Sequence, residues 1–208
     1  MFGHGFRVGP APYVALCEAW AAAGYVVAAP TFLHAVGPDA NEADLSNEPA
    51  DMSFVISSLV AAPYVDGARV AVAGHSDGGE AAFAAGFQAG MADPRVRAVI
   101  ALSVQPLTGS VVERPGGLPV LFAQGTDDTV NPYSRGLAAY GQVSAPKFLL
   151  VLRGAEHLPP FAGQSPWAAV VDRVTTDFLD RYLAGRPAPL EADGSVAGVA
   201  TLDLSETS

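Results

Sequence analysis

The sequence has a single cysteine and few basic residues. Because Cys17 stands alone, it cannot form a disulfide within the chain or part of a zinc site, which needs clustered ligands, and we predict a buried, unreactive thiol. The chain has 11 lysine and arginine residues against 21 aspartates and glutamates, for a net charge of −10 at pH 7. A surface this acidic repels phosphate groups, so neither a nucleic acid nor an anionic membrane is an expected partner.

The sequence also lacks an uninterrupted apolar segment that could cross a membrane. Residues 19–38 carry no acidic or basic side chain, and their number is about that of a spanning helix. Gly24, Pro30 and Gly37 interrupt the segment, and we predict a helix, a turn, a strand and a loop instead. The first residues lack the basic and apolar regions of a signal peptide, so the sequence predicts no compartment; secretion stays open if an upstream segment is missing. The sequence predicts no oligomeric state either.

Half of the 208 residues are apolar, which is enough for a single domain over residues 1–208 with a sizeable core. Short apolar runs predict strands at residues 25–29, 69–73, 96–102, 118–123 and 148–152. Amphipathic patterns predict helices at residues 12–23, 49–62, 80–89, 131–140 and 166–184. This alternation predicts an α/β fold whose mostly parallel sheet is covered by helices on both faces. Residues 186–208 show little periodicity and are predicted to form an irregular tail.

The segment Gly74-His75-Ser76-Asp77-Gly78 has the G-x-S-x-G pattern of a nucleophile elbow. It follows a predicted strand and precedes a predicted helix, which is the setting that this turn requires. The turn is so tight that its serine must adopt an unusual backbone conformation, and side chains at the glycine positions would collide. We therefore predict that Ser76 is a nucleophile; the alternative is a serine that caps an ordinary turn.

A serine nucleophile needs a base within hydrogen-bond reach and a third group that orients the base. Two later strand ends supply these residue types. Asp127 and Asp128 follow the strand predicted at residues 118–123, and His157 follows the strand predicted at residues 148–152. The order serine, aspartate, histidine is that of α/β-hydrolases, and either aspartate could be the orienting acid.

These motifs resemble those of α/β-hydrolases, and more narrowly of the bacterial branch with polyester hydrolases (cutinase-like and PET-hydrolase-like) and chlorophyllase-like esterases. The resemblance runs from residue 4 to about residue 184. It rests on His4-Gly5-Phe6, the elbow, residues 128–132 and residues 154–157. In that family a small residue, an aliphatic residue, any residue and a proline follow the acid, which selects Asp128 over Asp127. The resemblance implies an α/β-hydrolase three-layer sandwich.

The resemblance also implies how a developing oxyanion is bound. Its donors are the backbone N–H groups of Asp77, which follows the nucleophile, and of Phe6, which follows His4-Gly5. Core packing is the alternative role for Phe6. By their places in the same motifs, the residues expected to bind substrate are Phe6, His75, Val104, Gln105 and Leu158. Residues 103–107 lack the aromatic side chain that PET-active relatives carry there, which argues against activity on aromatic polyesters.

The predicted protein is a serine hydrolase that cleaves small or polymeric carboxylic esters through an acyl-enzyme on Ser76, with His157 and Asp128 completing the triad. We expect no metal ion, because four histidines without clustered carboxylates make no metal site, and no organic cofactor. Two alternatives stay open. One is a catalytically silent fragment or binding module, and the other is an amide or peptide hydrolase with the same triad.

The start of the chain departs from the resembled fold. The His4-Gly5-Phe6 segment normally follows the third strand, which lies between the strands predicted here at residues 25–29 and 69–73. Without that strand, both would keep unpaired backbone N–H and C=O groups inside the sheet. We therefore expect an N-terminally truncated reading frame that lacks the first strands; the alternative is a minimal fold in which the two strands pair directly.

Overall fold

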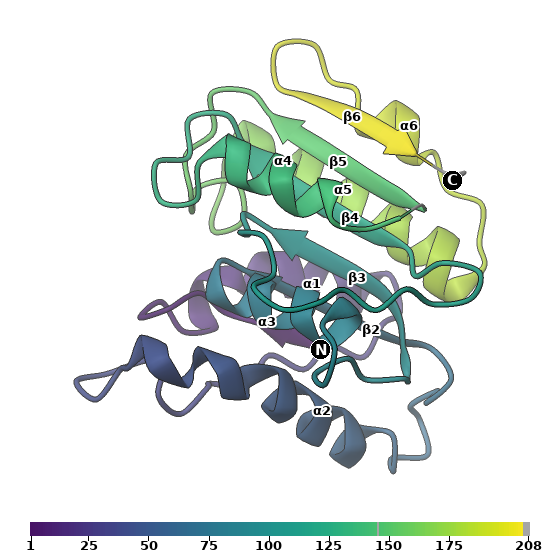
Figure 1. Ribbon diagram of the computed structural model, residues 1–208. Coiled ribbons are helices and arrows are strands. Elements are labelled where there is room, and N and C mark those ends of the chain that lie inside the picture. Colours follow the sequence, from purple (N-terminus) through teal and green to yellow (C-terminus); the bar gives the residue numbers. More distant parts are fainter. Residues whose placement is uncertain (145, 206–208) are drawn as a thin grey trace.

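The computed structural model describes residues 1–144 and 146–205, and its strands form a single sheet (Figure 1). Across the sheet the order is β1-β2-β3-β4-β5-β6, and all neighbours are parallel except β5 and β6. The bounds are Phe2–Gly3 (β1), Val70–His75 (β2), Val96–Leu102 (β3), Val120–Gly125 (β4), Lys147–Leu152 (β5) and Ala200–Ser205 (β6). The predicted α/β class with a mostly parallel sheet is confirmed.

Helices cover both faces of the sheet and complete the three layers (Figure 1). One face carries α1 and α5, which bury side chains in one apolar cluster, and the other carries α2, α3 and α4, which bury theirs in a second. The α-helices are Val14–Ala22 (α1), Glu48–Leu59 (α2), Asp77–Phe87 (α3), Tyr133–Gly141 (α4), Pro166–Leu179 (α5) and Leu190–Asp193 (α6). The helical segments of other types are the 3₁₀ helices Ala11–Tyr13 (η1) and Glu42–Asn47 (η2) and the π-helix Asp180–Ala184 (η3), which continues α5.

The two clusters are built from large side chains that meet across the layers. On one face, Trp20 of α1 packs near Phe2, with ring centroids 5.9 Å apart, and its indole Nε1 donates to Thr175 Oγ1 of α5 at 2.9 Å. On the other face, Phe83 of α3 meets Phe122 of β4 edge to face, with ring centroids 5.2 Å apart. Each fully buried side chain of this size stabilises the fold by about 1.5–3 kcal/mol, so both helix layers are firmly attached to the sheet.

The strand predicted at residues 25–29 is wrong, because this segment does not form a strand. It accepts one backbone hydrogen bond, from Phe2 N to Ala28 O at 2.8 Å, and β1 is too short to extend this contact into a ladder. The alternative prediction, that this segment pairs directly with β2, is wrong as well. Phe2 and Gly3 pair with Ala73 and Gly74 of β2, so β1 lies between the two.

The prediction of an irregular tail is wrong for α6 and β6, while residues 206–208 lie outside the described residues. β6 runs antiparallel to β5, from Ala200 opposite Leu152 to Ser205 opposite Lys147. It is an edge strand with exposed side chains at Asp203 and Leu204. Because only part of such a strand is buried, its sequence need not be continuously apolar, and the pattern that reveals the central strands is missing.

A substitution at Gly125 tests how closely β4 packs against the loop that carries His157. A Cβ added to Gly125 would lie 2.2 Å from the carbonyl oxygen of Ala155, whereas one added to Gly141 would meet nothing within 4 Å. We expect Gly125→Ala to lower the free energy of unfolding by about 1–3 kcal/mol through overpacking. Gly141→Ala, the control, should stay within about 0.5 kcal/mol of the wild type. Urea denaturation measures both, and equal stability of the two variants would contradict the close approach.

Candidate active site

Ser76 occupies a strained turn between β2 and α3. Its backbone has φ 54° and ψ −126°, which costs a non-glycine residue about 1–3 kcal/mol unless the surroundings enforce it. Two hydrogen bonds hold the turn: Ser76 N donates to Leu102 O at 2.9 Å, and Glu80 N donates to Ser76 O at 2.8 Å. Helix α3 begins at Asp77, directly after the serine, which is earlier than the predicted start at Glu80.

Close backbone packing explains the glycines around this turn. A Cβ added to Gly74 would lie 2.1 Å from Gly78 O, and one added to Gly78 would lie 2.3 Å from the carbonyl carbon of Gly3. Because real Cβ atoms do not approach other atoms this closely, only glycine fits these positions. The first turn of α3 is therefore pressed against both β2 and β1.

The predicted oxyanion loop lies beside Ser76. A Cβ added to Gly5 would be 3.4 Å from Ser76 Cβ. His4 is fully buried; its Nε2 accepts from Phe32 N at 3.1 Å, which leaves Nδ1–H to donate to Gly5 O at 3.0 Å. Since the N–H and C=O of a trans peptide point in opposite directions, this bond also fixes the direction of the Phe6 N–H.

His157 lies against Asp128 rather than Asp127. The distance from His157 Nδ1 to Asp128 Oδ2 is 2.8 Å. Asp128 is 4 % exposed, whereas the Asp127 side chain is exposed and accepts from Thr126 Oγ1 at 2.9 Å. The aspartate that contacts His157 is therefore the one that the family register selects.

Further donors surround the Asp128 carboxylate. Oδ1 accepts from the backbone N–H groups of Val130 at 2.9 Å and Asn131 at 2.8 Å. Oδ2 also accepts from Ser103 Oγ at 2.9 Å and from Gln124 Nε2 at 3.2 Å. Sequence reasoning missed these supporting residues; Ser103, which has φ 49° at the end of β3, follows a predicted strand end and could have been considered.

These bonds decide the charge of Asp128. Burial alone would raise its pKa, but hydrogen bonds from His157, Asn131 and Ser103 outweigh burial and lower it. An ionised Asp128 keeps the proton of His157 on Nδ1 and leaves Nε2 as the basic nitrogen.

His75 connects the turn at Ser76 to the loop that carries His157. Its Nε2 lies 2.9 Å from His157 O, and the two imidazole centroids are 4.5 Å apart. Ser76, Asp128 and His157 all lie beyond the carboxyl ends of the parallel strands β2, β4 and β5, at the same end of the sheet.

The residues predicted to bind substrate fall into two groups. Phe6, Gln105 and Leu158 are half-buried and keep accessible surface. His75 and Val104 are each only 1 % exposed and lie beneath the surface. Val104 is packed under the first turn of α3, since a Cβ added to Gly79 would lie 2.7 Å from its Cγ1.

Three carboxyl groups near the first turn of α3 have raised pKa values. Glu48 is 4 % exposed, and its Oε2 has no hydrogen-bond partner among the described residues. Burial, followed by the charge of Asp77, raises the pKa of Glu48 to about 8 and that of Glu80 to about 7. The pKa of Asp77 is also raised, by burial and then by Glu42. Although helix N-termini favour carboxylates, desolvation and mutual repulsion outweigh that preference here.

Other potential reactive groups do not join this arrangement. Among residues 1–144 and 146–205, no three histidine, cysteine, aspartate or glutamate side chains are grouped so that they could hold a metal ion. Cys17 is half-buried, and burial raises the pKa of its thiol to about 11. Within the same described residues, no helix combines the length and the apolar character needed to span a membrane.

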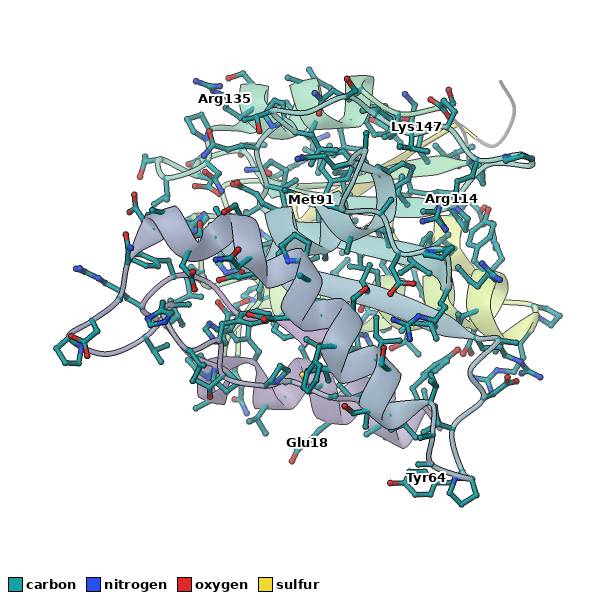
Figure 2. All side chains as sticks on the ribbon, turned by 60° about the horizontal axis from the view of Figure 1, so that its bottom comes forward. Glu18, Tyr64, Met91, Arg114, Arg135 and Lys147 are labelled. Atoms are coloured by element: carbon teal, nitrogen blue, oxygen red, sulfur yellow. The ribbon has the colours of Figure 1, made fainter. Side chains whose placement is uncertain are left out.

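A cavity of about 260 Å³ is lined by residues other than the predicted site residues. Val27, Val60, Tyr64 and Arg69 are among its lining residues, so it lies between the segment after α1, the end of α2 and the start of β2. Tyr64 is 74 % exposed and projects from the loop after α2 (Figure 2). The cavity therefore contributes nothing to the arrangement around Ser76.

A family model described as Chlorophyllase matches residues 1–124, which is more than half of the 208 residues. The chain belongs to the chlorophyllase family. This family lies within the α/β-hydrolases and indicates ester hydrolysis, so the predicted resemblance is confirmed for its chlorophyllase-like branch. The matched part includes the predicted oxyanion loop and the elbow, and it ends before Asp128 and His157. A search of curated proteins found no match.

Glu48 makes the stability of this chlorophyllase-family protein depend on pH. Its raised native pKa means that between about pH 4.5 and about pH 8 the unfolded chain releases a proton that the folded chain keeps, so stability falls as pH rises through this range. We expect Glu48→Gln to remove this loss and to raise the melting temperature at pH 8 more than at pH 4.

Thermal denaturation at both pH values measures the effect of Glu48→Gln. Glu18→Gln serves as the control, because Glu18 projects into solvent from α1 (Figure 2). Its melting temperature should differ little from the wild type at either pH. A Glu48→Gln effect of the same size at both pH values would contradict a raised pKa in the folded state.

Proposed function

We propose that the protein is a serine esterase in which Ser76 is the nucleophile, His157 the general base and Asp128 the orienting acid. The observation that carries the proposal is the 2.8 Å contact between His157 Nδ1 and Asp128 Oδ2, at the sheet edge where Ser76 occupies a strained elbow. Membership of the chlorophyllase family supports an ester as the bond that is cleaved.

The proposed reaction begins with attack of Ser76 Oγ on the ester carbonyl carbon while His157 Nε2 takes the hydroxyl proton. Asp128 stabilises the imidazolium that forms, and the backbone N–H groups of Phe6 and Asp77 bind the oxyanion. When the tetrahedral intermediate collapses, the alcohol leaves with the proton from His157, and an acyl group stays on Ser76. Water then attacks the acyl-enzyme in the same way, and the carboxylic acid and free Ser76 are released.

Charge around the elbow favours neutral substrates. Asp77, Glu80 and Glu48 interact electrostatically with one another beside Ser76, and any of them that is ionised would repel a substrate carboxylate. Phe6 and Leu158 offer accessible apolar surface for an acyl or alcohol group. We propose uncharged carboxylic esters of short or medium chain length. The missing aromatic side chain at residues 103–107 argues against aromatic polyesters.

Replacing the nucleophile tests this assignment. Ser76→Ala should lower kcat for a p-nitrophenyl ester by about 10⁴-fold or more, because the remaining triad members cannot act without it. Ser110→Ala, at an exposed serine, is the matched control and should keep full activity. Ester turnover that survives in Ser76→Ala would refute the assignment.

A fluorophosphonate probe separates an active esterase from a catalytically silent module. The probe reacts covalently with an activated serine, so the wild type should be labelled and Ser76→Ala should not. A folded wild-type protein that neither turns over esters nor takes up the probe would favour the silent module.

A further inference from the structure

Three hydrogen bonds connect the predicted oxyanion loop to the predicted base through the interior. Gly5 N donates to Tyr13 Oη at 3.3 Å. Tyr13 Oη lies 2.8 Å from His75 Nδ1, and His75 Nε2 lies 2.9 Å from His157 O. Tyr13 and His75 are 0 % and 1 % exposed, so water does not compete for these bonds.

The two ends of this chain of bonds fix the direction of every proton in it. The amide of Gly5 can only donate and the carbonyl of His157 can only accept. Tyr13 Oη therefore accepts from Gly5 and has one proton left, which it gives to His75 Nδ1. His75 must then carry its own proton on Nε2 and donate it to His157 O.

Burial supports the same proton arrangement. It raises the pKa of Tyr13 to about 12 and lowers that of His75 to about 3, with the neighbouring His157 adding to the second shift. The phenol thus keeps its proton and the imidazole stays neutral. A proton on Nδ1 instead would leave the buried Tyr13 proton without this acceptor and would set the Nε2 lone pair against the carbonyl oxygen.

The bonds join segments that are far apart in sequence but carry different parts of the proposed machinery. Gly5 precedes Phe6 in the loop after β1, Tyr13 ends η1, His75 ends β2, and His157 lies in the loop after β5. The His75 ring also contacts two other rings in tilted arrangements, with centroid distances of 4.5 Å to His157 and 5.0 Å to Phe161. A shift of the histidine loop would therefore be transmitted to the oxyanion loop.

We propose that Tyr13 and His75 are positioning residues, which hold the loop of the Phe6 N–H and the loop of His157 in fixed positions relative to each other. This role rests on the proposed esterase function. Neither residue transfers a proton in the reaction, because this chain of hydrogen bonds, called the relay below, ends on the backbone carbonyl of His157 and not on its ring. Its effect lies in the geometry of the transition state, so it should change kcat rather than KM.

Two variants with nearly conserved shape test the relay. Tyr13→Phe removes the phenol oxygen, and His75→Phe keeps a ring but removes both nitrogen atoms. Each should lower kcat for a p-nitrophenyl ester roughly tenfold to a hundredfold with KM little changed. The double variant should lose much less than the product of the two single losses, since either change breaks the same chain of bonds. Tyr64→Phe, at an exposed tyrosine, is the control and should behave like the wild type.

A spectroscopic measurement tests the proton order without relying on activity. In ¹⁵N NMR of histidine-labelled Ser76→Ala protein, His75 should be the neutral Nε2–H tautomer; His75→Phe assigns its signals. The Nδ1–H tautomer would overturn the relay, and so would wild-type kcat in both single variants while turnover still depends on Ser76. If the wild type shows no Ser76-dependent turnover, the proposed function fails, and the tautomer alone then decides the proton order.

Discussion

The close contact of three backbone segments, at Gly3 of β1, Gly74 of β2 and Gly78 of α3, determines where the rest of the site can lie. A Cβ at either of the last two positions would overlap backbone atoms of a neighbouring segment. Because α3 is pressed so tightly onto the sheet, the chain must turn sharply at Ser76, and the serine accepts a positive φ of 54°. The same contact brings the loop after β1 beside Ser76, so one packing constraint places both the proposed nucleophile and the predicted oxyanion donors.

Burial has opposite consequences for the carboxyl groups on the two sides of this turn. Asp128 is buried among backbone N–H groups, Ser103 and His157, and these donors lower its pKa. Glu48 is buried with one oxygen unpartnered among the described residues and close to another acidic residue, Asp77, and its pKa rises to about 8. What separates them is the supply of donors rather than the depth of burial. The fold thus keeps an anion where a triad needs one and favours the neutral form of Glu48 near Asp77.

Much of this arrangement could be predicted from sequence because local patterns carry it. The central strands are apolar and buried on both faces. The glycines of the elbow form a recognisable pattern in the sequence, between a predicted strand and a predicted helix. The choice of Asp128 required a family register, since Asp127 has the same chemistry one residue earlier.

Other features could not be predicted because they depend on partners distant in sequence. Residues 25–29 are apolar but have only the two-residue β1 beside them, and β6 is an edge strand without a continuous apolar pattern. Tyr13 and Ser103 gain their roles only when the fold brings them to His75 and Asp128.

The central claim is that Asp128 orients His157 as the base that activates Ser76 for attack on an ester. A comparison of two adjacent aspartates tests this claim most directly. The measurement is kcat/KM for a p-nitrophenyl ester in Asp128→Asn and Asp127→Asn. An amide at position 128 can no longer hold the Nδ1–H tautomer of His157, so the first variant should lose about 10³–10⁴-fold, whereas the exposed Asp127 should be replaceable without loss. Equal activities of the two variants would contradict the account.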